Sequence, residues 1–167
     1  MIALLDTSED LLVCRQELGC PVEQLLTPLT MFNRQNKRGK FAIDNGAFAG
    51  FKSGSFKGLL LREKDARSLC RFLAVPDVVA KSAHDGAARR TLEVFHHWKY
   101  KLSGWPLALV AQDGIEDLEI PWSHIEIVAL ILSEILPRIC ICGHSSPAGR
   151  IGTLGISAKL GLHVFNQ

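Results

Sequence analysis

The chain has 167 residues, of which 47% are hydrophobic and 22% are charged, and its formal net charge is +2. This composition is that of a folded globular protein, and it excludes an intrinsically disordered chain. The small net charge does not by itself indicate nucleic-acid binding, so basic clusters such as Lys99 with Lys101 are interpreted as solvated surface. A chain of this length suits one hydrophobic core, and we expect a single domain over residues 1–167.

The cysteines and the apolar segments indicate the compartment. The cysteine count of five is odd in a chain too large to need disulfides, which favours a reducing environment. The amino terminus lacks a basic segment and reaches an acid at Asp6, so we do not expect a signal peptide. The longest apolar run, residues 125–136, is interrupted by charges and falls short of the roughly 20 residues that span a bilayer. These features predict a soluble, cytoplasmic protein with no membrane partner.

The first part of the chain contains the strand around which the rest is organised. Residues 1–39 are the least legible segment, although residues 2–5 are apolar enough to form a first strand. Residues 40–43 are predicted to form a buried strand, because this run stops at a turn-forming Asp-Asn-Gly sequence. Residues 47–57 are rich in Gly, Ser and Phe, and we expect an ordered loop there.

Helices and strands are expected to alternate through the middle of the chain. Residues 59–69 carry leucines and charges at helical spacing, and a strand over residues 72–75 follows. A second helix is expected over residues 85–102, and a third strand over residues 107–111. This alternation, repeated roughly every 30 residues, is typical of βαβ units and therefore of a parallel sheet.

The last part of the chain does not continue the regular alternation of strands and helices. Residues 125–132 form a fourth apolar run that suits a strand, and residues 147–160 suit a helix weakened by three glycines. We therefore divide the domain into the lead-in 1–39, the parallel strands of 40–132 and a divergent tail over 133–167. The fold class is α/β, but the chain is short for a complete (β/α)8 barrel, which usually needs roughly 250 residues.

Three of the predicted strands end in polar, turn-forming clusters. The clusters are Asp44-Asn45-Gly46, Pro76-Asp77 and Gln112-Asp113-Gly114. Because the carboxyl ends of parallel strands meet at one edge of a sheet, we expect one site formed by Asp44, Asp77, Gln112 and Asp113. Asp-Asn-Gly is also favourable turn chemistry, so a purely local role for the first cluster remains open.

These residue types match the hydrogen-bonding edges of a purine base. A carboxylate accepts hydrogen bonds from ring and exocyclic N–H groups, and a glutamine amide donates to a carbonyl. A further carboxylate near the sugar stabilises positive charge or moves a proton, as paired carboxylates do in glycosyl transfer. Phe48, Phe51 or Phe56 could stack on a flat ligand, and packing against the core is an equally good interpretation of these rings.

A metal site is the weaker alternative. Cys140, Cys142 and His144 are zinc-ligand types, but their spacing is tight and no fourth ligand is evident, so a small metal-dependent hydrolase is kept only as a third hypothesis. The chain has no nucleophile elbow and no phosphate-binding loop of the Gly-x-x-x-x-Gly-Lys type. We expect neither a metal nor a cofactor.

Several stretches in a fixed order carry a resemblance to a known family. They are Phe-Ala-Ile-Asp-Asn-Gly-Ala-Phe from Phe41 to Phe48, Ala-Val-Pro-Asp-Val-Val from Ala74 to Val79, Asp85 through Thr91 and Leu92 with Trp98, and Trp-Pro-Leu-Ala-Leu-Val-Ala-Gln-Asp-Gly from Trp105 to Gly114 followed by Ile-Pro-Trp at Ile120 to Trp122. Over roughly residues 25–130, the chain resembles the tRNA-guanine transglycosylase superfamily. It is similar to the phage and bacterial branch that inserts 7-deazapurines into DNA.

The resemblance implies a TIM barrel enzyme, present here as its amino-terminal half, that exchanges guanine in DNA or tRNA for a free 7-deazaguanine base. It implies that Asp44 is the catalytic general acid/base, that Asp77 reads the donor edge of the base and that Gln112 reads its carbonyl. The residues around them complete the expected base-binding set, which is Asn45, Gly46, Phe48, Asp113 and Gly114. A homodimer is compatible with the family.

The chain also departs from the family pattern. A glycine-rich base-binding turn is expected after the fourth strand, but residues 129–134 read Ala-Leu-Ile-Leu-Ser-Glu. The nucleophilic aspartate of the family lies beyond a segment whose start His163-Val164 resembles, and no residue is nominated for it. One hypothesis is a shifted reading frame after about Val128. The alternative function is therefore a catalytically incomplete remnant, or a module that binds the base or the nucleic acid without a nucleophile.

Overall fold

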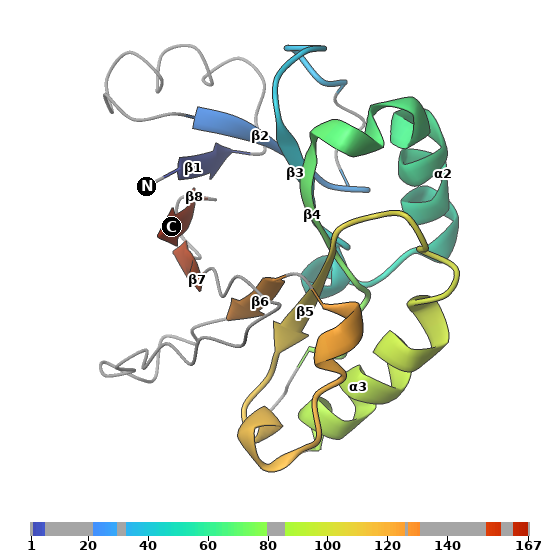
Figure 1. Cartoon of the computed structure of the whole chain (residues 1–167), viewed down its shortest axis with the longest axis vertical. Coiled ribbons are helices and arrows are strands. Elements are labelled where there is room, and N and C mark those ends of the chain that lie inside the picture. The colour runs from blue at the N-terminus through green and yellow to red at the C-terminus, as the bar shows by residue number, and fades with distance from the viewer. Residues whose placement is uncertain are drawn as a thin grey trace.

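The computed structural model describes residues 2–5, 22–29, 33–79, 86–125, 127–130, 153–157 and 162–166. Most of the described regular structure is a single sheet with helices on one side of it (Figure 1). The strands are β1 (Ile2–Leu5), β2 (Val22–Leu26), β3 (Phe41–Ile43), β4 (Cys70–Ala74), β5 (Leu107–Ala111), β6 (Ile127–Leu130), β7 (Thr153–Ser157) and β8 (Leu162–Asn166). The helices are α2 (Ser53–Glu63) and α3 (Ala87–Trp98), with short 3-10 turns at Ala47–Ala49, Lys64–Leu69, Ile115–Asp117 and Trp122–His124.

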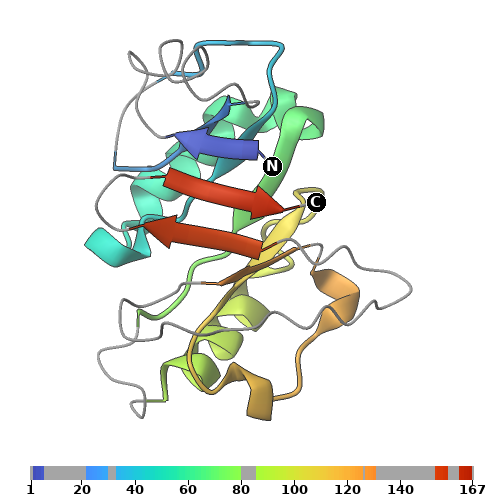
Figure 2. The same ribbon diagram turned by 90° about the vertical axis from the view of Figure 1, so that its left-hand side faces the viewer.

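The sheet is parallel through its first six strands in chain order. Strands β1 to β6 each pair in parallel with the next, for example with Leu25 opposite Ala42 in β2 and β3. Strand β8 pairs antiparallel with β1 and with β7, so it lies between them (Figure 2). The strands follow a ring in Figure 1, in which β7 comes close to β6. The chain therefore has a mixed α/β fold in which successive strand ends lie at one edge.

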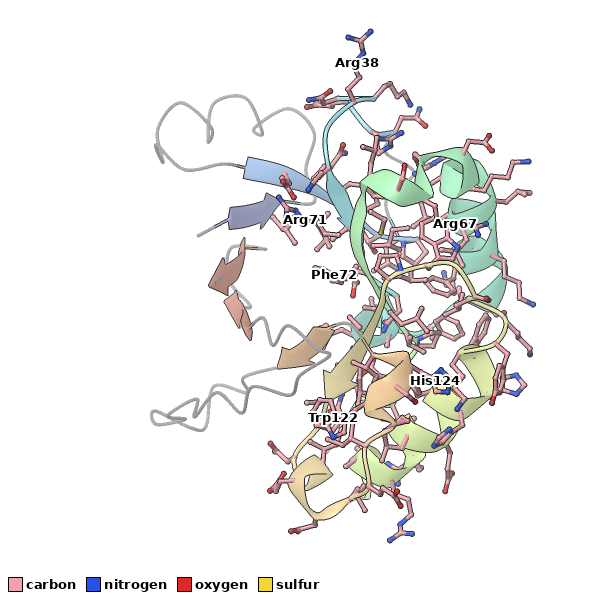
Figure 3. The ribbon with its side chains drawn as sticks, viewed as in Figure 1. Arg38, Arg67, Arg71, Phe72, Trp122 and His124 are labelled. Atoms are coloured by element: carbon pink, nitrogen blue, oxygen red, sulfur yellow. The ribbon has the colours of Figure 1, made fainter. Side chains whose placement is uncertain are left out.

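Both faces of the central strands are buried, and alternate residues go to each face. Phe41 and Ile43 of β3 face the helices, whereas Ala42 between them belongs to a second cluster on the opposite face. Phe72 of β4 lies on that opposite face as well, away from the helices (Figure 3). Burial on two faces explains why these strands read as continuous apolar runs in the sequence.

Helix α3 covers the sheet with one apolar stripe. Ala88, Leu92, Phe95 and Trp98 recur at helical spacing and are all buried. The helix starts after Gly86, whose φ of 73° lies in the left-handed region that glycine adopts without strain. Its fully buried Phe95 contributes about 2 kcal/mol by burial of apolar surface.

The strands predicted in the middle of the chain are confirmed within about two residues. Strand β5 has the predicted bounds, and β3, β4 and β6 lie within one to two residues of theirs. The first predicted strand is β1. The helix expected to reach residue 102 ends at Trp98, although the N–H of Leu102 still bonds to the Trp98 carbonyl at 3.0 Å.

Other expectations were wrong. The loop predicted over residues 47–57 is partly helical, because α2 already begins at Ser53 and its last turns continue as a 3-10 helix to Leu69. The helix predicted over residues 147–160 is contradicted by strand β7 at Thr153–Ser157, and its glycines are consistent with that result. Strand β2 was not predicted at all.

Two predictions concern absences. No helix among the described residues is long and apolar enough to cross a membrane. The described residues also contain no group of three His, Cys, Asp or Glu side chains that could hold a metal ion. The alternative zinc ligands Cys140, Cys142 and His144 lie outside the described residues.

Candidate functional site

The end of β3 forms a tight turn that is held by its own side chains. The N–H of Asp44 donates to the Leu26 carbonyl at 2.8 Å, which extends the parallel pairing by one residue. Asp44 Oδ2 then accepts the Gly46 N–H at 3.0 Å, and Asn45 Oδ1 accepts the Ala47 N–H at 2.6 Å. Gly46 has φ of 74°, and a Cβ there would lie 2.9 Å from Cγ of Pro28. The turn therefore requires glycine for both its backbone angle and the available space.

Asn45 links the end of β3 to the end of β4. Its Nδ2 donates to the Val75 carbonyl at 2.9 Å and to Asp77 Oδ1 at 2.8 Å. The side chain is buried, so these bonds replace the water that it loses on folding. Because its oxygen also accepts a backbone N–H, the orientation of the amide is determined by its partners.

Gln112 extends the link to the end of β5. Its Nε2 donates to Asp77 Oδ2 at 2.7 Å, and the side chain is buried. The two oxygens of Asp77 therefore each accept an amide N–H, one from a neighbouring strand on either side. We call this group of Asn45, Asp77 and Gln112 the carboxylate clamp.

Burial dominates the electrostatics of the clamp. Loss of solvent is the largest cause that raises the pKa of Asp77, the charge of Asp44 also raises it, and the net pKa is about 6 instead of 3.8. The hydrogen bonds from Asn45 and Gln112 lower the pKa because they favour the ionised form, but they do not offset burial. At neutral pH the carboxylate is ionised, with little margin before it takes up a proton.

Helix α3 supports the segment that follows Asp77. The hydroxyl of Thr91 accepts the Val78 N–H at 3.0 Å and approaches the Val78 carbonyl at 3.4 Å. Thr91 is almost fully buried, on the same apolar stripe as Leu92 and Phe95. No role for Thr91 was expected from the sequence. A hydroxyl on an otherwise apolar helix stripe is the signal that could have pointed to it.

The structure brings together Asp44, Asn45, Asp77 and Gln112 of the predicted site, and it leaves other members at its margin. Asp113 is exposed, and no described contact joins it to the clamp. Gly114 adopts φ of 84° in the turn after β5, where the Ile115 N–H bonds to the Gln112 carbonyl at 3.1 Å. Phe48 lies on the Ala47–Ala49 turn and is 86% exposed, so it is not packed into the core.

The arrangement defines a class of site, namely a partly buried carboxylate held by two buried amides at the ends of three adjacent parallel strands, with a second carboxylate beside it. Such a group can accept hydrogen bonds from a ligand and can exchange a proton near neutral pH. Comparison with models of protein families, with curated proteins and with solved structures found no match for this chain.

Proposed function

We propose that the carboxylate clamp binds guanine or a free 7-deazaguanine base, and that the protein exchanges one for the other in DNA or tRNA. The observation that carries the proposal is the position of Asp77, whose two oxygens are directed by Asn45 and Gln112. Guanine and 7-deazaguanine present a ring N–H and an exocyclic amino group side by side. A fixed, ionised carboxylate is complementary to that pair of donors.

Gln112 suits the neighbouring carbonyl of the base. Its amide nitrogen donates to Asp77 Oδ2 at 2.7 Å, so Gln112 adjoins the carboxylate that would accept the base donors. An amide N–H group is the donor type that a base carbonyl requires. Adjacent donor and acceptor groups of this kind discriminate between bases more strongly than shape alone, because a mismatched base leaves buried polar groups unpaired.

Asp44 is the proposed acid/base of the exchange. When guanine is replaced, the bond between the sugar carbon and the outgoing base breaks, and a bond from the same carbon to the incoming base forms. The outgoing base gains one proton and the incoming base loses one. Asp44 is partly exposed beside the clamp, and its charge is close enough to affect the pKa of Asp77. A carboxylate in that position suits the transfer of this proton.

The order of the strands supports the finer fold proposal of a partial TIM barrel. The units β3-α2-β4 and β4-α3-β5 alternate strand and helix, and the strands pair in parallel in chain order. Sites of barrel enzymes lie beyond the carboxyl ends of such strands, which is where Asp44, Asp77 and Gln112 lie.

Binding of free bases tests the proposal. Wild-type protein is expected to bind 7-deazaguanine and guanine, and to bind hypoxanthine about tenfold or more weakly, because hypoxanthine lacks the amino group that donates to the Asp77 carboxylate. The Asp77→Asn variant should lose this discrimination, since an amide cannot accept with both of its positions. Isothermal titration of each base into each variant measures the difference. Equal affinity for guanine and hypoxanthine in the wild type would refute the proposed base site.

Exchange of the base is tested separately with Asp44. The Asp44→Asn variant keeps the acceptor for the Gly46 N–H, so it should still bind the free base. It is expected to release labelled guanine from an oligonucleotide or tRNA at a rate lowered by about 100-fold, the usual contribution of a general acid/base. If wild-type protein binds the base but releases no guanine, the alternative of a binding module without a nucleophile is supported instead.

A further inference from the structure

A cationic surface forms where α2 and α3 meet. Lys57 of α2 and Lys101 after α3 both place their ammonium groups near the ring of Trp98, at 5.7 Å and 5.4 Å from its centroid. Lys101 also lies 2.6 Å from Nε2 of His97. Trp98 is itself buried and packs against Phe56, so the lysines flank a fixed ring rather than a mobile one. The sequence alone places Lys57 far from Lys101, and the fold brings them to one ring.

The positive charge of this surface is not neutralised within the described part of the chain. No ion pair to Lys57, Lys99 or Lys101 is found among the described residues. The nearest acids along the two helices do not compensate it: Glu63 is buried against Arg34 and Arg62, and exposed Glu93 forms no described ion pair. Uncompensated lysines in close proximity favour an anionic partner.

An exposed aromatic ring adjoins Lys99, which precedes Lys101 by two residues. Tyr100 is 72% exposed, and Nζ of Lys99 lies 4.9 Å from its ring centroid. The ring of His124 meets Tyr100 at 6.2 Å, nearly edge to face, which leaves the side chain supported from one direction. An aromatic face next to several cations is the combination by which proteins hold single-stranded nucleic acids.

The surface lies close in the chain to the carboxylate clamp. Phe51 contacts Trp98 at 5.8 Å between ring centroids, and it follows the exposed Phe48 by three residues. Three residues span at most about 11 Å. The turn after Asp44 and the lysines at Trp98 are therefore close enough for one polynucleotide to reach both.

We propose that Lys57, Lys99, Tyr100 and Lys101, with His97, form a surface that binds the phosphate backbone of a single-stranded polynucleotide. The choice of a polynucleotide over another polyanion rests on the proposed function. The lysines neutralise phosphates, and Tyr100 stacks on one base. The surface needs no particular base, so it acts separately from recognition by Asp77.

Fluorescence anisotropy with a labelled thymidine oligonucleotide of about 20 nucleotides tests the surface, and a uridine oligonucleotide is run in parallel. Neither contains guanine, so the base site does not contribute. The Lys57→Gln/Lys101→Gln double variant should reduce the slope of log affinity against log salt concentration by about 1.4, or 0.7 for each lost phosphate contact. Tyr100→Leu should weaken binding by about tenfold without changing that slope.

The matched control removes the same charge elsewhere. Lys37→Gln/Arg38→Gln changes two exposed side chains in the turn before β3, and Arg38 lies at the opposite end of the molecule from α3 (Figure 3). This variant should bind both oligonucleotides with the wild-type slope. The inference is overturned if both double variants lose affinity equally, or if neither does. If the lysine surface fails this test but base binding still depends on Asp77, the proposed function stands. If the lysine surface passes and base binding does not depend on Asp77, only the base site is refuted.

Discussion

At the scale of single residues, the surroundings of Asp77 change its acidity. Burial raises its pKa to about 6, and the two amides that hold it limit the rise because they favour the ionised form. The carboxylate is therefore a ready acceptor above that pH and a neutral group below it. Hydrogen bonds to a ligand N–H should weaken as the pH falls through about 6.

The same pKa predicts how Asp77 affects stability. Because the folded pKa is raised above the value of 3.8, the folded state binds the proton more tightly than the unfolded state between these two values. The contribution of Asp77 to the free energy of unfolding is therefore greatest below about pH 4 and is lost as the pH rises through about 6. We expect a loss of about 2 kcal/mol over this interval, from a shift of about two pKa units.

Comparison with Asp77→Asn isolates this contribution. The amide has no proton to release in this range, so the difference in unfolding free energy between wild type and variant should change by about 2 kcal/mol from pH 4 to pH 7, in favour of the variant at higher pH. Urea unfolding at several pH values measures it. A difference that does not vary with pH would mean that the Asp77 pKa is close to its unfolded value.

At the scale of elements, we expect replacement of glycine by alanine to change stability in opposite directions at two positions with different surroundings. Gly46→Ala should destabilise the protein by about 2 kcal/mol or more, because its φ is 74° and a Cβ would press on Pro28. Gly58 lies inside α2, where a Cβ would meet nothing within 4 Å. Gly58→Ala should therefore stabilise the helix by about 1 kcal/mol. Thermal unfolding of the two variants gives the signs directly.

Base binding should be measured in the same two glycine variants. Gly46→Ala displaces the N–H that bonds Asp44, so base binding should weaken together with stability. Gly58→Ala should leave base binding unchanged. Equal losses of stability in both variants would contradict the role assigned to the turn after β3.

The elements that the sequence predicts are those whose burial is visible in it. Strands β3 and β5 are apolar on both faces, β4 is apolar and buried from Phe72 onward, and each stops at a polar cluster. Strand β2 contains Glu23 and Gln24, so its pattern does not look buried. The structure explains both: Arg71, 48 residues away, bonds Glu23 through two nitrogens, and Gln24 bonds the backbone at Asn33 and Gln35. Such distant partners cannot be read from the local sequence.

The site was predictable to a similar extent. The clustering of Asp44, Asp77 and Gln112 follows from parallel strands and from where each apolar run stops. The orientation of the amides does not. Asn45 and Gln112 both donate to Asp77 across 32 and 35 residues, and this choice of partner depends on the register between strands. Thr91 was given no role because its partner at Val78 comes into reach only when α3 packs on the sheet.

At the scale of the whole molecule, a buried ion pair joins the helical layer to the segment before β3. Arg34 Nε donates to Glu63 Oε2 at 2.8 Å, and both side chains are buried. Arg34 also donates to the Lys37 carbonyl and lies 4.7 Å over the ring of Phe41. The pair thus connects the end of α2, the β2–β3 connection and the sheet.

Glu63→Ala should cost about 3–5 kcal/mol of stability, because it leaves the Arg34 guanidinium buried without a carboxylate. Arg62 also bonds Glu63, but its side chain is 32% exposed, so Arg62→Ala should cost about 1 kcal/mol or less. Urea unfolding at neutral pH measures both. Replacing the pair together, as Arg34→Met with Glu63→Leu, should recover most of the loss, and failure to recover it would mean that the ion pair itself stabilises the fold.

The topology also has a consequence for the order of folding during synthesis. All the contacts of the carboxylate clamp lie between residues 45 and 112. Strand β1, in contrast, pairs on one side with β8, whose residues come after 160 in the chain. Synthesis releases the amino-terminal residues first, at roughly 5–20 residues per second. Contacts with short sequence separation also form sooner than distant ones. The hydrogen bonds from Asn45 and Gln112 to Asp77 can therefore form while the ribosome is still adding the residues of β8 that will pair with β1.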